Sequence, residues 1–181
     1  MLAHGLDRVE HVPLPLTGDH APLPLAVHAS YSREEILPAL GQSVIGGGVM
    51  PGIFREGVTW CENIQTDALL ITLEKDEKDF SPQTRYKDYA MNEVLFHWES
   101  QNRTSEGSPT GMRYQNHVKN GSHVLLFVRR FKSTDIGGPQ AWMLLGPADY
   151  VRHSGSKPMA IEWNLHHEMP ADVWAYSTIA N

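Results

Sequence analysis

An alternation of apolar and polar residues with a period of two is the clearest structural signal along this chain. In the segment 94–101, Phe96 and Trp98 fall on one face of an extended backbone, whereas His97 and Glu99 fall on the other. Since successive side chains of a strand point to opposite faces of a sheet, this pattern predicts a strand with one buried face. Phe96 and Trp98 are accordingly expected to contribute mainly to the core.

Continuous apolar runs predict further strands that are buried on both faces. Such runs lie at residues 68–73, 122–131, 141–145 and 159–165. Two residue pairs between the last two runs, Gly146 with Pro147 and Ser154 with Gly155, have the chemistry of turns. We therefore expect the chain to turn at both pairs.

Short helices are predicted from capping and turn residues. Ser32 followed by Glu35 forms a capping box, which predicts the start of a helix, and Gly41 favours its end. Pro38 lies inside this segment and keeps the helix short or bent. Further helical segments are expected at residues 112–118, after a polar loop at 102–111, and at residues 171–179.

These elements amount to roughly six strands and two or three short helices, without a regular alternation of strand and helix. We therefore predict an α+β domain whose sheet is mainly antiparallel and barrel-like. Residues 1–28 are rich in proline and lack a hydrophobic period, so they are predicted to form an extended linker or arm. Residues 29–181 are predicted to form the domain itself.

Composition limits the cellular setting of the protein. Cys61 is the one cysteine of the chain, which excludes an internal disulfide and a zinc site built on cysteines. A reducing compartment, the cytoplasm, is therefore expected. No apolar run approaches the roughly 20 residues that a membrane helix needs, and the first residues have neither the basic start nor the apolar run of a signal peptide.

Charge is distributed unevenly along the chain. The formal net charge is −6, which by itself disfavours a nucleic-acid partner. Residues 80–160 nevertheless carry 10 basic and 6 acidic side chains, whereas residues 1–79 carry 5 basic and 12 acidic ones. A positive middle within an acidic chain is typical of a phosphate-binding face, and an ordinary mixed surface is the alternative.

Aromatic and basic residues interleave most densely at residues 81–101. A stacked base needs a ring against its face, worth about 1–3 kcal/mol per base, and basic groups for the adjoining phosphates. A carboxylate such as Asp88 can accept the exocyclic amine of cytosine. The candidate base-pocket residues are Tyr86, Asp88, Tyr89 and Trp98. In an extended segment Asp88 shares a face with Tyr86 and not with Tyr89, so a turn is required for all three to converge.

Six basic side chains are candidates for contacts with the DNA backbone, because arginine and lysine neutralise phosphates. They are Arg85, Lys87, Arg113, Arg129, Arg130 and Lys132. Arg130 and Lys132 share one face of an extended segment and can present two charges to one stretch of phosphates. Charge protection of an edge strand is the alternative role for them. A second candidate ring set comprises Trp60, Trp98 and Trp142.

Patterns for metal binding or covalent catalysis are lacking in the sequence. Its histidines show neither the His-x3-His nor the His-Glu-x-x-His spacing, and Cys61 has no neighbour suited to thiol catalysis. We therefore expect no metal, no cofactor and no catalytic activity. The alternative is a metal-dependent nuclease, in which Asp67 precedes a strand and Asp76 and Lys78 follow it. The acidic residues after that strand more simply form a solvated turn.

Several motifs together resemble a domain found in large bacterial restriction proteins. The motifs, between about Tyr31 and Pro170, are TRYKDYA, LFHWESQNRTSE, SPTGMRYQNH, NGSHVLLFVRRFK and LLGPADYVRHSGSKPM. In those proteins the domain follows a phospholipase-D-type nuclease and a DEAD/DEAH-box helicase. The resemblance implies an SRA-like (SET and RING-associated) fold, which is a PUA-like β-barrel.

What the resemblance implies for function is recognition of double-stranded DNA that carries a modified cytosine. SRA-like domains rotate the modified base into an aromatic pocket. The expected partners are therefore DNA and a helicase or nuclease in cis or in trans, with no membrane. A protein-interaction or regulatory domain that couples to a helicase or nuclease, without recognising a base, is the alternative from a different class.

Overall fold

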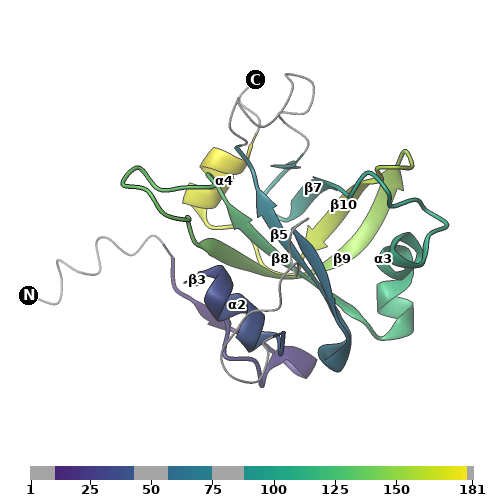
Figure 1. The fold of residues 1–181 in the computed structure, drawn as a ribbon, viewed down its shortest axis with the longest axis horizontal. Helices are drawn as coiled ribbons and strands as arrows, with labels where there is room; N and C mark the ends of the chain where they lie inside the picture. Colours follow the sequence, from purple (N-terminus) through teal and green to yellow (C-terminus); the bar gives the residue numbers. More distant parts are fainter. Residues whose placement is uncertain (1–10, 43–56, 75–87, 179–181) are drawn as a thin grey trace, which may run out of the picture.

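The computed structural model describes residues 11–42, 57–74 and 88–178. Within these ranges the chain forms one eight-stranded sheet, a separate two-stranded pair and three helices (Figure 1). The large sheet comprises β3 (Ser30–Tyr31), β4 (Val58–Cys61), β5 (Thr66–Thr72), β6 (Tyr89–Ala90), β7 (Leu95–Glu99), β8 (His123–Arg129), β9 (Trp142–Ser154) and β10 (Ala160–Leu165). The small pair is β1 (Leu14–Pro15) and β2 (Ala26–Val27), and the helices are α2 (Arg33–Ala39), α3 (Pro109–Asn120) and α4 (Ala171–Ser177). Single 3-10 turns lie at Gly18–His20 and Glu62–Ile64.

The strand order of the large sheet is β4-β5-β8-β9-β10-β7-β6, and β3 pairs with β9 beside this path. Neighbouring strands are antiparallel except for β5 and β8, which are parallel. The prediction of an α+β domain with a mainly antiparallel sheet is therefore confirmed. The described strands form an open sheet that begins at β4 and ends at β6, and they do not close into a barrel.

The centre of the sheet is covered on both faces, which explains the uninterrupted apolar runs. Along β5, Leu69 and Ile71 belong to one core cluster, whereas Ala68 and Leu70 belong to the other. This alternation follows from the two-residue period of a strand. The first cluster includes residues of α3 and α4, and the second is covered by α2 and the N-terminal segment. Figure 1 shows α2 on one side of β5 and β8, away from α3 and α4.

Local signals located α2 as predicted, whereas α3 is longer than predicted. The capping box of α2 is present, with the Ser32 backbone N–H donating to Glu35 Oε2 at 2.7 Å, and Pro38 lies inside the helix as expected. Helix α3 begins earlier than predicted, at Pro109, because Ser108 caps it by accepting a hydrogen bond from the Gly111 N–H at 3.1 Å. The expected loop at 102–111 is correspondingly shorter.

The turn predicted at Gly146 and Pro147 is wrong, because β9 continues through both residues. Gly146 has a φ of +104° and lies beside an irregularity in the register between β8 and β9. A glycine at positive φ bends a strand without ending it. The second predicted turn is confirmed, since β9 ends at Ser154 and Gly155 has a φ of +69°.

The described part of the expected N-terminal arm packs against the domain. Leu16, Leu25 and Val27 are buried and belong to the second core cluster. The prolines of this segment set its turns, and the apolar residues between them still reach the sheet. Residues 1–10 of the predicted arm lie outside the described residues. Within the described ranges, none of the helices has the length and apolar content required to cross a membrane.

Candidate nucleic-acid interface

The four predicted base-pocket residues occupy different environments. Asp88 and Tyr89 lie at the beginning of β6 and are half-buried, whereas Tyr86 lies outside the described residues, as do Arg85 and Lys87. Trp98 is 5% exposed and packs edge-to-face against Tyr114, with 5.7 Å between ring centroids. Trp98 is therefore a core residue, as the alternation along β7 predicts, and it faces away from the side on which His97 lies.

Tyr89 is stacked on His97 of the neighbouring strand. The two residues are direct partners in the antiparallel register of β6 and β7. Their ring centroids are 4.6 Å apart and their planes differ by 18°. Residues directly opposite in an antiparallel pair are close enough for such ring contacts. Both side chains are half-buried, so the stack is held by the sheet and still reaches solvent.

The stack continues into a row of side chains across four strands. His97 is in register with Glu162 of β10, which is in register with Arg152 of β9. Arg152 Nε lies 2.9 Å from Glu162 Oε1, and the Arg152 side chain is 69% exposed. We call these residues, Tyr89, His97, Glu162 and Arg152, the Tyr89 row. It lies on the face opposite to Phe96, Trp98 and Trp163, which are in the core.

Asp88 is held at the edge of the Tyr89 row. The Glu99 backbone N–H donates to Asp88 Oδ1 at 2.9 Å. This bond fixes the carboxylate one residue before Tyr89, at the point where the chain enters β6. The structure therefore brings Tyr89 and His97 into contact, whereas Asp88 is held by the Glu99 backbone at the residue before β6. Sequence reasoning missed the role of His97 because the pairing of β6 with β7 was needed to find it.

Arg113, one of the predicted DNA-backbone residues, is bound to a buried carboxylate. Its Nε and Nη2 donate to Asp67 at 2.6 and 2.8 Å, and its guanidinium lies 4.3 Å from the centre of the Trp60 ring. Asp67 is 2% exposed. Burial raises the pKa of Asp67, and the hydrogen bonds from Arg113 oppose that shift. The nuclease hypothesis needs an accessible carboxylate at Asp67, whereas this one is enclosed and paired.

Arg129 is also held inside the structure. It donates to Thr72 Oγ1 at 2.9 Å and to the Gln140 carbonyl at 3.1 Å, and it lies 3.7 Å above the centre of the Trp142 ring. Burial lowers the pKa of Arg129 to about 10. This guanidinium therefore contributes to the packing of β8 on β9 and is poorly placed for a phosphate contact.

The other two described residues of the predicted DNA-backbone set, Arg130 and Lys132, are exposed. Arg130 Nε lies 2.6 Å from Glu74 Oε1, so part of its charge is balanced locally. The second candidate ring set does not come together, because Trp98 and Trp142 belong to different core clusters. Arginines cover Trp60 and Trp142, as described above.

Basic residues that the sequence analysis did not select lie near the Tyr89 row. Arg152 is a member of the row, and Lys157 is exposed in the turn between β9 and β10. The Lys157 backbone N–H donates to the Thr104 carbonyl at 3.0 Å, which brings exposed Arg103 to the same end of the sheet. The turn signal at Ser154 and Gly155 could have identified this group, because basic residues flank it.

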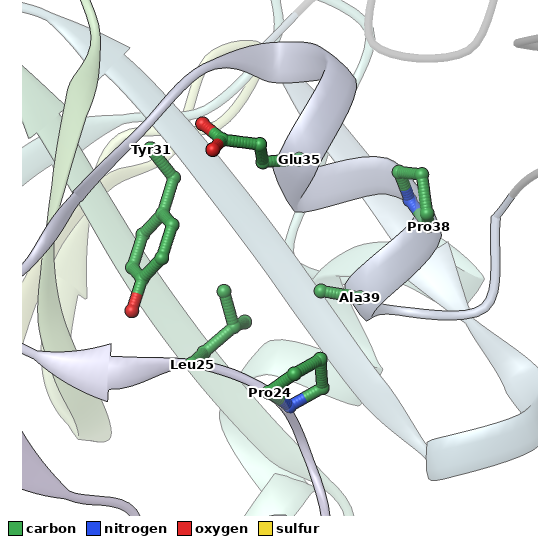
Figure 2. A pocket seen from close by; sticks show the side chains of 6 residues that line it. All are labelled: Pro24, Leu25, Tyr31, Glu35, Pro38 and Ala39. Carbon is green, nitrogen blue, oxygen red and sulfur yellow. The ribbon is translucent and has the colours of Figure 1, made fainter.

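A concave pocket of about 360 Å³ lies between α2 and the segment that leads into β2. Figure 2 shows its lining, which consists of Pro24, Leu25, Tyr31, Glu35, Pro38 and Ala39. We call it the Tyr31 pocket. The Tyr31 ring forms one wall and the Glu35 carboxylate stands at the rim, with Ala39 and Pro38 on the side of α2 (Figure 2). Among the described residues, no group of three His, Cys, Asp or Glu side chains is arranged to hold a metal ion.

Comparison with models of protein families matches residues 25–177 to one family, whose description is "Domain of unknown function (DUF3427)". The match covers β2 to α4 and thus includes the Tyr89 row and every lining residue of the Tyr31 pocket except Pro24. No curated protein matches the chain.

Proposed function

The chain belongs to the DUF3427 family, whose description assigns no function, and we propose that it is a DNA-binding recognition module without catalytic activity of its own. In this proposal it recognises a modified cytosine, such as 5-methylcytosine, that is rotated out of the duplex. The module would act in the cytoplasm within a modification-dependent restriction system, beside a helicase and a nuclease in cis or in trans. Support for this setting comes from the motifs that resemble a domain of large bacterial restriction proteins, and the PUA/SRA-like fold that this resemblance implies is part of the same proposal.

The observation that carries the proposal is the stack of Tyr89 on His97 at the surface of the sheet. A base that leaves the duplex loses a few kcal/mol of stacking and pairing, which the protein must replace. Ring stacking supplies about 1–3 kcal/mol per base. A ring that is already oriented by the register of β6 and β7 offers this contact with little loss of side-chain freedom, and the carboxylate of the preceding residue, Asp88, is held by the Glu99 N–H.

Phosphate contacts in this proposal come from the exposed basic residues near the Tyr89 row. Arg152 and Lys157 lie on the hairpin of β9 and β10, and Arg103 lies on the adjoining loop. The proposal therefore moves the phosphate contacts away from Arg113 and Arg129, which are engaged within the fold. Arg130 and Lys132 remain candidates because their side chains are at the surface.

Matched duplexes with and without 5-methylcytosine test this function. Fluorescence anisotropy at fixed salt should show tighter binding of the modified duplex by the native chain. Tyr89→Ala should reduce that preference by about 5- to 150-fold, which corresponds to the loss of one stacked base. Tyr89→Phe keeps the ring and should retain most of the preference. Incubation of the native chain with methylated plasmid DNA and Mg²⁺ or Mn²⁺ should leave the DNA uncleaved.

Tyr31→Ala is the matched control, because it also replaces a tyrosine by alanine, in the Tyr31 pocket and not in the Tyr89 row. It should leave the preference for the modified duplex unchanged, and all variants should first be shown to melt at similar temperatures. Full discrimination by Tyr89→Ala and by His97→Ala would refute the role of the stack. Failure of the native chain to bind any duplex at low salt would refute the DNA-binding function.

A protein-interaction domain is the second candidate function, and the Tyr31 pocket favours it. The pocket is concave and mostly apolar, as ligand and peptide sites usually are. The two functions are compatible, because the Tyr31 pocket and the Tyr89 row are built from different residues.

A further inference from the structure

The Tyr31 pocket is held in shape by contacts that do not depend on a ligand. The Tyr31 hydroxyl accepts a hydrogen bond from the Ala26 N–H at 2.8 Å, which fixes the ring against the segment entering β2. β3, which carries Tyr31, is paired with β9. The floor is Leu25, which is 7% exposed and belongs to the second core cluster. A ligand would therefore meet a largely preformed site, which reduces the entropy lost on binding.

The carboxylate at the rim is also fixed. Glu35 Oε2 accepts hydrogen bonds from the Ser32 N–H at 2.7 Å and from the Ser32 hydroxyl at 2.9 Å. These bonds lower the pKa of Glu35, so the group is charged throughout the neutral range. In Figure 2 the carboxylate lies next to the Cβ end of Tyr31, and the Tyr31 ring extends from there toward Leu25.

The one charged side chain among the six lining residues is the Glu35 carboxylate. Its neighbours in the first turn of α2 are Arg33 and Glu34, so this turn is net negative. Phosphates of DNA are repelled by such a surface, whereas a lysine or arginine is attracted. The lining itself, Pro24, Leu25, Pro38 and Ala39, suits aliphatic groups. The Tyr31 ring suits both an aliphatic stem and a cation.

We propose that the Tyr31 pocket docks a peptide segment of a partner protein in which a lysine or arginine adjoins apolar residues. The apolar stem of the basic side chain packs between Tyr31 and the prolines, and its charged head reaches the Glu35 carboxylate. A neighbouring apolar residue of the peptide covers Leu25 and Ala39. The site is thus a surface for a second protein, separate from the Tyr89 row and independent of whether that row binds DNA.

Titration of the full isotopically labelled chain with short peptides tests the proposal by NMR. The probe is the acetylated and amidated pentapeptide Leu-Arg-Leu-Pro-Leu, and its matched analogues carry glutamine or glutamate in place of arginine. The arginine peptide should shift amide signals of α2, β2 and β3, with a dissociation constant on the order of 0.1–1 mM for so small a contact. The glutamine peptide should bind several-fold more weakly, and the glutamate peptide should not bind.

Variants identify the residues responsible. Glu35→Gln should weaken the arginine peptide by about three- to fivefold, as expected for a partly solvated ion pair. Tyr31→Ala should weaken it by about tenfold. Ala39→Lys places a like charge at the lining without removing any wall, and it should abolish binding even if Tyr31→Ala does not fold. Glu34→Gln changes a neighbouring exposed carboxylate outside the lining and should alter the affinity by less than about twofold.

Three results would overturn the proposal. The first is the absence of shifts at millimolar arginine peptide, and the second is equal binding of the arginine and glutamate peptides. The third is specific binding of 5-methylcytidine in this pocket, which would make it a second base site. DNA binding by the same Tyr31→Ala and Glu35→Gln proteins should be unchanged, so failure of the docking proposal is distinguishable from failure of the DNA-binding function.

Discussion

Removal of Arg113 should expose how much of the fold depends on one buried ion pair. Asp67 is 2% exposed in the native chain, and Arg113→Ala removes the two donors that lie 2.6 and 2.8 Å from its carboxylate. An uncompensated buried charge of this kind costs about 3–5 kcal/mol. The substitution also removes the contact between the guanidinium and the Trp60 ring, whose centre lies 4.3 Å away in the native chain. This contact is worth about 0.5–2 kcal/mol, part of which is already included in the cost of the buried charge.

Urea unfolding followed by tryptophan fluorescence at pH 7 measures this cost, with the slope of the transition checked for a constant value. For a chain of this size the melting temperature should fall by roughly 10 °C. Asp67→Asn should cost less, about 1–2 kcal/mol, because the Arg113 side chain is 23% exposed and water can replace part of the bond.

The double variant Asp67→Leu with Arg113→Met separates the contribution of the two charges to stability from the contribution of side-chain packing. Since neither charge remains buried and both side chains keep much of their volume, its stability should lie within about 1 kcal/mol of the native chain. A loss below about 1 kcal/mol for Arg113→Ala, or a loss above about 3 kcal/mol for the double variant, would refute the view that Arg113 serves to neutralise Asp67. It would also restore Arg113 as a candidate for contact with DNA.

Three further predictions follow from individual side chains. Arg152→Ala together with Lys157→Ala should weaken modified and unmodified duplexes alike and reduce the slope of log affinity against log salt by about 2, and an unchanged slope would remove the hairpin from the interface. Burial, together with the neighbouring His123, lowers the pKa of His20 to about 4, so the folded chain binds this proton less readily than the unfolded chain, whose value is 6.5. The contribution of neutral His20 to the free energy of unfolding is therefore full above pH 6.5 and is lost as the pH drops toward 4, with about 2 kcal/mol lost at pH 5. Urea unfolding over this pH range should show a smaller fall in stability for His20→Gln than for the native chain. Gly146→Ala should cost about 1–3 kcal/mol, because the φ of +104° is unfavourable to alanine and its Cβ would lie 3.2 Å from Val27, whereas Gly107→Ala, with nothing within 4 Å, should be neutral in the same assay.

The sequence predicted those parts of the fold that depend on neighbouring residues. The capping box of Ser32 and Glu35 located α2, and the alternation at Phe96 and Trp98 identified the buried face of β7. The turn assigned to Gly146 and Pro147 was wrong, because a glycine with positive φ has the same sequence signature in a bent strand as in a turn. The burial of the proline-rich segment was missed because prolines mark turns but do not determine whether the residues between them are buried.

The candidate site was harder to predict because it depends on pairing between distant residues. Arg113 and Asp67 are 46 residues apart in sequence, and local patterns do not indicate that one neutralises the other. Asp88 and Tyr89 were selected for their chemistry, whereas the stacking partner His97 emerges only from the register of β6 on β7. The Tyr31 pocket was not predicted, since it combines a helix with a segment that was expected to be an extended arm.

The parallel pairing of β5 with β8 has a consequence for folding of the chain during its synthesis on the ribosome. Paired residues of these strands, such as Thr72 and Arg129, are 57 residues apart in the chain. At about 5–20 residues per second, the ribosome needs roughly 3–11 s to synthesise that interval. During this time β5, which is buried on both faces in the finished domain, has emerged without its central partner. For this period the nascent chain exposes an apolar strand that can associate with other chains. Slower translation of the segment between β5 and β8 would lengthen the period.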